Sequence, residues 1–131
     1  EHLVAADADG ATVTGTVRLG QLFTDDQGLP AWVGVEWMAQ AIAAWAGCRA
    51  RRRGEPVKLG FLLGTRRYQA HCSHFRIRAQ LRVEAHCELF GDNGLGMFAC
   101  RILDDGVVLA SANLSVFEPD DSAAYLEGHA P

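Results

Sequence analysis

The sequence predicts a single α+β domain in which an antiparallel sheet wraps around one long central helix. Two observations predict this fold class. Residues 31–53 form a mostly apolar stretch with enough length for about six turns of helix. On both sides of it, short runs alternate between apolar and polar side chains, which is typical of strands that cover a core with one face.

The region before the helix is predicted to be a β-hairpin. Residues 2–8 and 11–19 are joined by Asp9 and Gly10, and this dipeptide favours a tight turn between antiparallel strands. A loop rich in glycine and aspartate follows. Pro30 then suits the first turn of the helix, where a missing backbone N–H has no cost.

The central helix is expected to be enclosed on several sides, because apolar side chains cover its whole circumference. Gly54 should end it, and the arginines of its last turn suit the negative end of the helix dipole. Glu36 and Gln40 are the polar exceptions near its middle. Together with the strands that follow, they favour a buried helix over a membrane span.

Everything after the helix is predicted as strand. Residues 57–70 are interpreted as a mostly buried run, and residues 80–90 alternate strictly. The inward face of that second run would carry Leu81, Val83, Ala85, Cys87 and Leu89. Residues 95–103 and 107–117 form a second hairpin. We expect residues 1–118 to form the domain and residues 119–131 a polar C-terminal tail.

This order of elements is the layout of the hotdog fold. Edge strands of such a sheet commonly pair across a dimer, which removes an exposed edge.

The net charge of −4 does not indicate a general nucleic-acid-binding protein. The four cysteines lack C-x-x-C spacing and are interpreted as reduced thiols of a cytoplasmic protein. A zinc site using Cys72 with His71 or His74 lacks a second close pair, so we predict no metal and no other cofactor.

The stretch "LPAWVGVEWMAQA" at positions 29–41 resembles, without a gap, the helix of bacterial 3-hydroxyacyl-(acyl-carrier-protein) dehydratases. Their pattern there reads roughly M-P-G-V-hydrophobic-hydrophobic-E-A-hydrophobic-A-Q. Pro30 matches the proline, Glu36 the catalytic carboxylate, and Ala39 with Gln40 the A-Q pair. Fold-level similarity extends over residues 11–117, and the divergent branch associated with aryl-polyene gene clusters is the best match.

The resemblance implies a dehydratase that acts on 3-hydroxyacyl thioesters carried by acyl carrier protein, in fatty acid or polyene/polyketide-type synthesis. One departure concerns a histidine. The common family pattern places H-F-P-G eight residues before the helix proline, and this chain has Leu22 at that position. The catalytic histidine is therefore outside this sequence, supplied by another residue, or missing. His71 and His74 could serve across a dimer, although solvated surface roles are the ordinary interpretation of such histidines.

Glu36 is expected to act as general acid or base, with Gln40 one turn later orienting the carboxyl or holding a water. An apolar surrounding of Trp32, Val33 and Trp37 would favour its proton-donating form. The backbone amides of residues 31–33 would hold the enolate oxygen, aided by the helix dipole. The alternative interpretation of Glu36 is a helix-end or dimer-interface carboxylate paired with an arginine.

The remaining site predictions concern the acyl chain and the carrier protein. The predicted substrate-binding residues are Ala31, Trp32, Val33, Trp37, Phe61, Leu62, Leu63 and Gly64. The last four would wall an acyl tunnel, with a plain core strand as the alternative. Acyl carrier proteins are acidic, so Arg51, Arg66 and Arg67 are predicted to dock one. A solvated helix end explains the arginines at 49–53 equally well.

Two other functions stay open at this point. In a hotdog acyl thioesterase the same carboxylate would activate water against the thioester. In a heterodimeric dehydratase this chain would be a non-catalytic acyl-binding subunit beside an active paralogue. The A-Q pair favours a dehydratase ancestry, whereas Leu22 in place of histidine favours the non-catalytic subunit. We expect a homodimer or a heterodimer with a related hotdog subunit, with the site at the interface.

Overall fold

The computed structural model describes residues 2–58 and 60–119, and its elements follow the predicted order. The strands are β1 (His2–Ala6), β2 (Gly10–Thr16), β3 (Leu29–Pro30), β4 (Phe61–Ala70), β5 (His74–Phe75), β6 (Gln80–Phe90), β7 (Leu95–Asp104) and β8 (Val107–Phe117). A 3-10 turn, η1 (Ala31–Val33), leads into the helix α1 (Gly34–Arg52). Most of the predicted tail, residues 120–131, lies outside the described residues.

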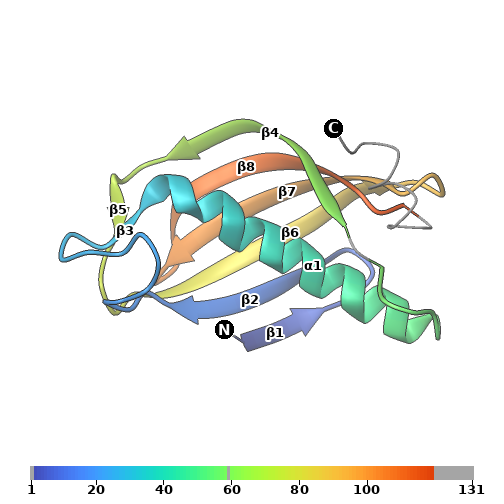
Figure 1. The fold of residues 1–131 in the computed structure, drawn as a ribbon, viewed down its shortest axis with the longest axis horizontal. Coiled ribbons are helices and arrows are strands. Elements are labelled where there is room, and N and C mark those ends of the chain that lie inside the picture. The colour runs from blue at the N-terminus through green and yellow to red at the C-terminus, as the bar shows by residue number, and fades with distance from the viewer. Residues whose placement is uncertain (1, 59, 120–131) are drawn as a thin grey trace.

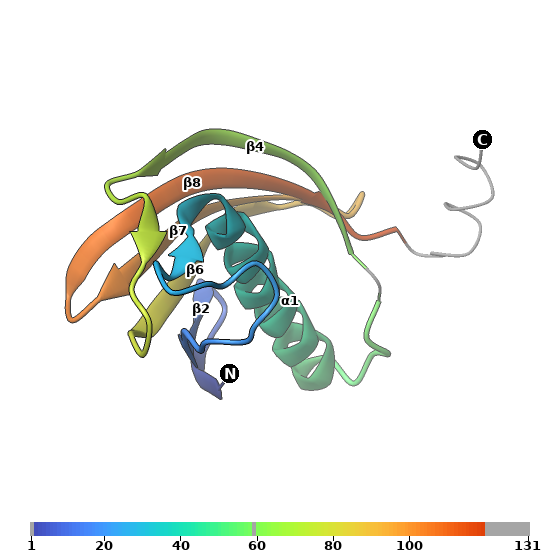
Figure 2. The ribbon, with the colours of Figure 1, turned by 60° about the vertical axis from the view of Figure 1, so that its left-hand side comes forward.

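Six strands form one antiparallel sheet in the order β1-β2-β6-β7-β8-β4, with β1 and β4 at its edges. The helix α1 runs across the concave face of this curved sheet (Figures 1 and 2). The α+β arrangement predicted from the sequence is therefore confirmed. Within the described residues, no helix combines the length and apolarity that a bilayer crossing needs.

The two ends of α1 have definite local causes. At the start, the Ala31 N–H donates to the Ser73 carbonyl oxygen at 2.9 Å, which ties η1 to the segment before β5. At the end, Gly54 has a φ of 65° and its N–H donates to the Arg51 carbonyl oxygen. Glycine adopts this left-handed conformation without a side-chain clash, so it ends the helix as predicted.

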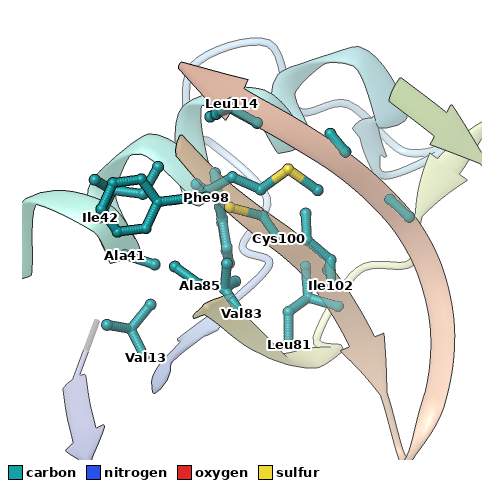
Figure 3. Close-up of a cluster of buried hydrophobic side chains, with 14 of the residues drawn as sticks. Val13, Ala41, Ile42, Leu81, Val83, Ala85, Phe98, Cys100, Ile102 and Leu114 are labelled. Atoms are coloured by element: carbon teal, nitrogen blue, oxygen red, sulfur yellow. The ribbon is translucent and has the colours of Figure 1, made fainter. Parts of the chain in front are cut away.

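The core lies between α1 and the inner face of the sheet (Figure 3). The helix contributes Trp37, Met38, Ala41, Ile42 and Trp45, and the sheet contributes Val13, Leu81, Val83, Ala85, Phe98, Cys100, Ile102 and Leu114. The Trp45 ring packs at 5.2 Å from Phe98 and 5.4 Å from Phe90, between ring centroids. Full burial of each large apolar side chain contributes about 1.5–3 kcal/mol, so this interface supplies the main stabilisation of the fold.

The expectation that residues 57–70 are mostly buried is wrong for the single chain. The strand β4 begins at Phe61, lies at the edge of the sheet, and exposes most of its side chains. Leu62 and Leu63 are 45% and 51% exposed. An apolar run indicates burial but does not say whether the chain's own core or another chain provides it.

The predicted inward position of Leu89 is also wrong, since this side chain is 58% exposed. The cause is a bulge in β6, where Cys87 pairs with Phe98 and Leu89 pairs with Met97. One extra residue on one strand reverses the direction of every later side chain. Leu89 therefore turns outward beside Met97, although the sequence alternates without interruption.

Candidate functional site

Glu36 lies at an open pocket beside the start of α1. The pocket has a volume of about 540 Å³ and is lined by Gln21, Leu22, Phe23, Leu29, Trp32, Val33, Val35, Glu36 and Trp37. Glu36 is the one ionisable side chain in this lining. The helix start therefore places a single carboxyl group against a wall whose other side chains are apolar except for Gln21.

The surrounding expected for Glu36 is only partly formed by this chain. Trp37 is buried, but Trp32 is 61% exposed and Glu36 itself is exposed. The single chain therefore does not shield this carboxyl from water. Within residues 2–58 and 60–119 Glu36 makes no ion pair, so an arginine partner from this part of the chain is excluded and an arginine across an interface stays an open alternative.

The rim of the pocket carries exposed apolar side chains. Leu22, at the position where the dehydratase pattern has histidine, is 77% exposed and lines the same pocket as Glu36. Its neighbour Phe23 has a φ of 68°, and its ring meets the Trp32 ring edge-on at 4.9 Å. An aliphatic side chain has no ionisable group, so this position supplies no acid or base beside Glu36.

The expected oxyanion site needs a correction at Ala31. Its N–H donates to the Ser73 carbonyl oxygen, and its side chain is buried. This amide is therefore not free to hold an enolate oxygen. Any such role falls to the amide of Trp32, which precedes the i→i+3 bonds of the 3-10 turn.

A second pocket lies between α1 and the start of β4. It is mainly apolar, with a volume of about 320 Å³, and is lined by Ala39, Ile42, Ala43, Trp45, Ala46, Val57, Lys58, Gly60, Phe61, Leu62, Phe90, Val116 and Glu118. Phe61 and Leu62, expected at the substrate, are in this lining, whereas Leu63 and Gly64 line neither pocket. Burial raises the pKa of the Glu118 carboxyl at its rim, although Lys58 and Arg49 oppose this.

The sequence analysis missed the alanines that line the second pocket on the same side of α1 as Glu36. Ala39, Ala43 and Ala46 follow Glu36 at intervals of three or four residues, which places them on the same side of α1. They line the second pocket, while Glu36 lines the first. The spacing is visible in the sequence, but in a stretch that is apolar all round it has no distinguishing signal.

The other candidate polar residues lie apart from the Glu36 pocket. Gln40 is half-buried one turn after Glu36 and is not part of the pocket lining. His74 pairs with Pro30 in the β3–β5 ladder, and its Nδ1 lies 3.1 Å from the Ser73 Oγ. Neither His74 nor the exposed His71 lines the pocket.

The three arginines expected at a carrier protein are all exposed, in two places. Arg51 is in the last turn of α1, and Arg66 and Arg67 are in the middle of β4. Arg67 also lines a shallow groove on the outer face of the sheet. No group of three or more histidine, cysteine, aspartate or glutamate side chains within the described ranges is placed to hold a metal ion.

Comparison with known proteins adds a family and a set of structures. A family described as ApeP dehydratase, ApeP-like, matches residues 1–127. No curated protein sequence matches this chain. Among solved structures, the chain is similar to the dehydratase heterocomplex ApeI:P from Xenorhabdus doucetiae, with a TM-score of 0.85 and 25% identity. That match covers 98% of this chain and 88% of the other.

Two more distant structures support the fold alone. S. sahachiroi AziG has a TM-score of 0.69 at 15% identity, over 90% of each chain. A hypothetical thioesterase from Streptococcus pneumoniae, solved with coenzyme A, has a TM-score of 0.70 at 11% identity, over 89% of this chain and 84% of the other. The hotdog fold predicted from the order of elements is thereby confirmed.

Proposed function

This chain belongs to the ApeP-like dehydratase family, and from that premise we propose that it is a hotdog dehydratase subunit acting on 3-hydroxyacyl thioesters of acyl carrier protein. Glu36 is its reacting carboxyl group. The observation that carries the proposal is the place of Glu36, which is the one ionisable side chain lining an apolar pocket at the start of the central helix.

Elimination of water from a 3-hydroxyacyl thioester needs an acid and a base. A base takes the proton from carbon 2, and that C–H electron pair becomes the double bond between carbons 2 and 3. The bond from carbon 3 to oxygen breaks, and the leaving hydroxyl takes a proton to depart as water. Glu36 donates this proton, and a positioned acid of this kind contributes about 10²–10⁴-fold to the rate.

The base comes from a related hotdog subunit. Leu22 occupies the place of the family histidine, and the pocket lining offers no second ionisable group. A second chain covering the exposed rings of Phe23 and Trp32 would also remove water from Glu36. The Xenorhabdus structure is described as a heterocomplex, which supports a heterodimer over a homodimer. The strand β4 lies at the edge of the sheet and offers a second surface for association.

The acyl chain follows the small-residue side of α1. From Glu36 it passes Ala39 and Ala43 into the second pocket, where Phe61 and Leu62 form the wall. Each methylene buried there contributes about 0.8 kcal/mol, so a longer chain binds more tightly until the pocket is full. Leu63 and Gly64 follow in β4 but lie outside this lining.

The polar parts of the substrate meet the backbone and the arginines. The amide of Trp32 holds the thioester oxygen as it gains charge, and Gln40 orients the carboxyl of Glu36. Arg51, Arg66 and Arg67 are exposed and attract the acidic carrier protein. Charge attraction of this kind changes the association rate and its salt dependence more than the chemical step.

The test is dehydration of a 3-hydroxyacyl carrier protein, followed as loss of one water by mass spectrometry. The chain is assayed alone and as the complex that co-purifies with it from its native host. Glu36→Gln should reduce the rate about 10²–10⁴-fold. Glu55→Gln, which changes an exposed glutamate beyond the end of α1, should keep the wild-type rate.

Three results would contradict the assignment. Dehydration that persists unchanged in Glu36→Gln excludes Glu36 as the acid. Release of free thiol without dehydration identifies a thioesterase. Absence of both reactions, with acyl binding retained, identifies the non-catalytic subunit, which Leu22 in the Glu36 pocket favours.

A further inference from the structure

The edge strand β4 leaves regular pairing between residues 66 and 69. Arg66 pairs with Asn113 and Gln69 with Ser111, so β4 has one residue more than β8 over this interval. Arg67 has a φ of 55°, in the left-handed region that side-chain-bearing residues rarely adopt. This conformation is unfavourable for arginine, so contacts nearby must compensate for it.

The bulge turns one side chain of β4 toward the helix. Tyr68 is half-buried, whereas Arg67 and Gln69 on either side of it are exposed. The Tyr68 hydroxyl donates a hydrogen bond to the carbonyl oxygen of Ala31, in η1. Bulges commonly redirect a side chain beside a functional site, and this one directs a donor at the turn before Glu36.

The helix start is shaped to receive this hydroxyl. A Cβ at Gly34 would collide with the Tyr68 hydroxyl and lie 2.9 Å from the Cδ1 of Ile102. The N–H of Gly34 donates to the same Ala31 carbonyl oxygen. The turn is also held from the other side, because the Ala31 N–H donates to Ser73.

We infer that Tyr68 is a positioning residue, whose hydroxyl, aimed by the bulge in β4, fixes the turn that carries Trp32 and Glu36. The inference depends on the proposed function only in that Glu36 is the reacting group. Burial raises the pKa of Tyr68 to about 12, with a further contribution from Cys72, so the hydroxyl keeps its proton at neutral pH. Because β4 lies at the sheet edge, a strand of a second chain that paired with its outer side would be connected to Glu36 through Tyr68.

The first test is amide hydrogen exchange of the full chain. In Tyr68→Phe, which removes only the hydroxyl, the hydrogen-bonded amides within residues 31–37, those of Ala31 and Gly34 among them, should exchange about tenfold faster, as expected for one lost hydrogen bond. The second half of α1 should exchange as in wild type. Deletion of Arg67 removes the extra residue and should have the same effect, whereas Arg67→Gly keeps the bulge and should leave exchange unchanged. Unchanged exchange of residues 31–37 in Tyr68→Phe would overturn the inference.

The second test separates positioning from simple stability. Dehydration by the complex should show a lower kcat in Tyr68→Phe with little change in KM, at a temperature where both proteins are folded. Faster exchange with an unchanged kcat would show a structural role only and would also overturn the inference. If wild type itself does not dehydrate, the proposed function fails, and the exchange result still decides whether Tyr68 holds the turn.

Discussion

The two sides of α1 differ in how far their side chains are buried. The side toward the sheet buries Met38, Ala41 and Trp45 almost completely. The side away from the sheet exposes Glu36 and Ala43, and Glu36 is its one charge before the arginines of the last turns. A helix that faces water ordinarily carries polar residues on that side. The apolar outward side of α1 therefore agrees with the proposal that an acyl chain and a second subunit contact it.

The comparison also explains why the sequence was partly misleading. A helix that is apolar all round was expected to be enclosed by its own sheet, but this chain covers it on one side. An apolar pattern predicts burial but does not distinguish cover by the same chain from cover by a second chain. Variants on the two sides should therefore change different properties.

The largest effect is expected on the buried side, at Trp45. Trp45→Ala should lower the free energy of unfolding by about 3–5 kcal/mol, because it leaves a cavity against Phe90 and Phe98. Urea denaturation followed by circular dichroism measures this. Trp45→Phe is the control and should cost much less, since the indole N–H is buried without a partner among the described residues. Equal losses in both variants would contradict this account of the packing.

A smaller effect is expected where α1 begins. Gly34→Ala adds a Cβ that collides with the Tyr68 hydroxyl and crowds Ile102. Overpacking of this kind costs about 1–3 kcal/mol. Thermal unfolding of the variant should show the loss, and Tyr68→Phe combined with Gly34→Ala should recover part of it. A fully additive pair would mean that the two residues do not meet.

On the outward side, stability and binding should separate. Ala43→Glu changes an exposed residue, so the free energy of unfolding should stay within about 0.5 kcal/mol of wild type. The same change puts a charge into the apolar second pocket and should abolish binding of a long acyl thioester. Equilibrium binding measured by tryptophan fluorescence checks this, with Ala43→Ser as the small control. If Ala43→Glu binds the acyl thioester as well as wild type does, the acyl chain does not bind along this side of α1.

The smallest effect concerns the outer face of the sheet, which has the charged pairs that the outward side of α1 lacks. Glu84 lies 2.7 Å from Arg101 and 3.1 Å from Arg82, between side-chain oxygen and nitrogen atoms. Burial acts to raise the pKa of Glu84, but hydrogen bonds and charge from the two arginines outweigh it and lower the pKa. A lowered pKa means that the stabilisation is present above the ordinary glutamate range and disappears as pH falls below it.

This linkage gives a test with a defined sign. Arg101→Gln should lower the free energy of unfolding by about 0.2–1 kcal/mol at about pH 7, as expected for a solvated pair. The difference from wild type should shrink as the pH falls below about 4 and Glu84 becomes protonated. Urea denaturation at several pH values measures it. If the difference in unfolding free energy grows toward acid pH, the ionised form of Glu84 does not provide the stabilisation.

The sequence by itself determined the helix, the hairpins and the match from Pro30 to Gln40, because each depends on the spacing of neighbouring residues. It also indicated that Leu22 takes the place of a histidine, and the structure puts both Leu22 and Glu36 in one pocket. Only the tertiary structure decided which way Leu89 and Tyr68 point, since a bulge adds one residue without any local sign in the pattern. It alone decided that the Ala31 amide is occupied, because its acceptor, Ser73, comes from a segment far along the chain.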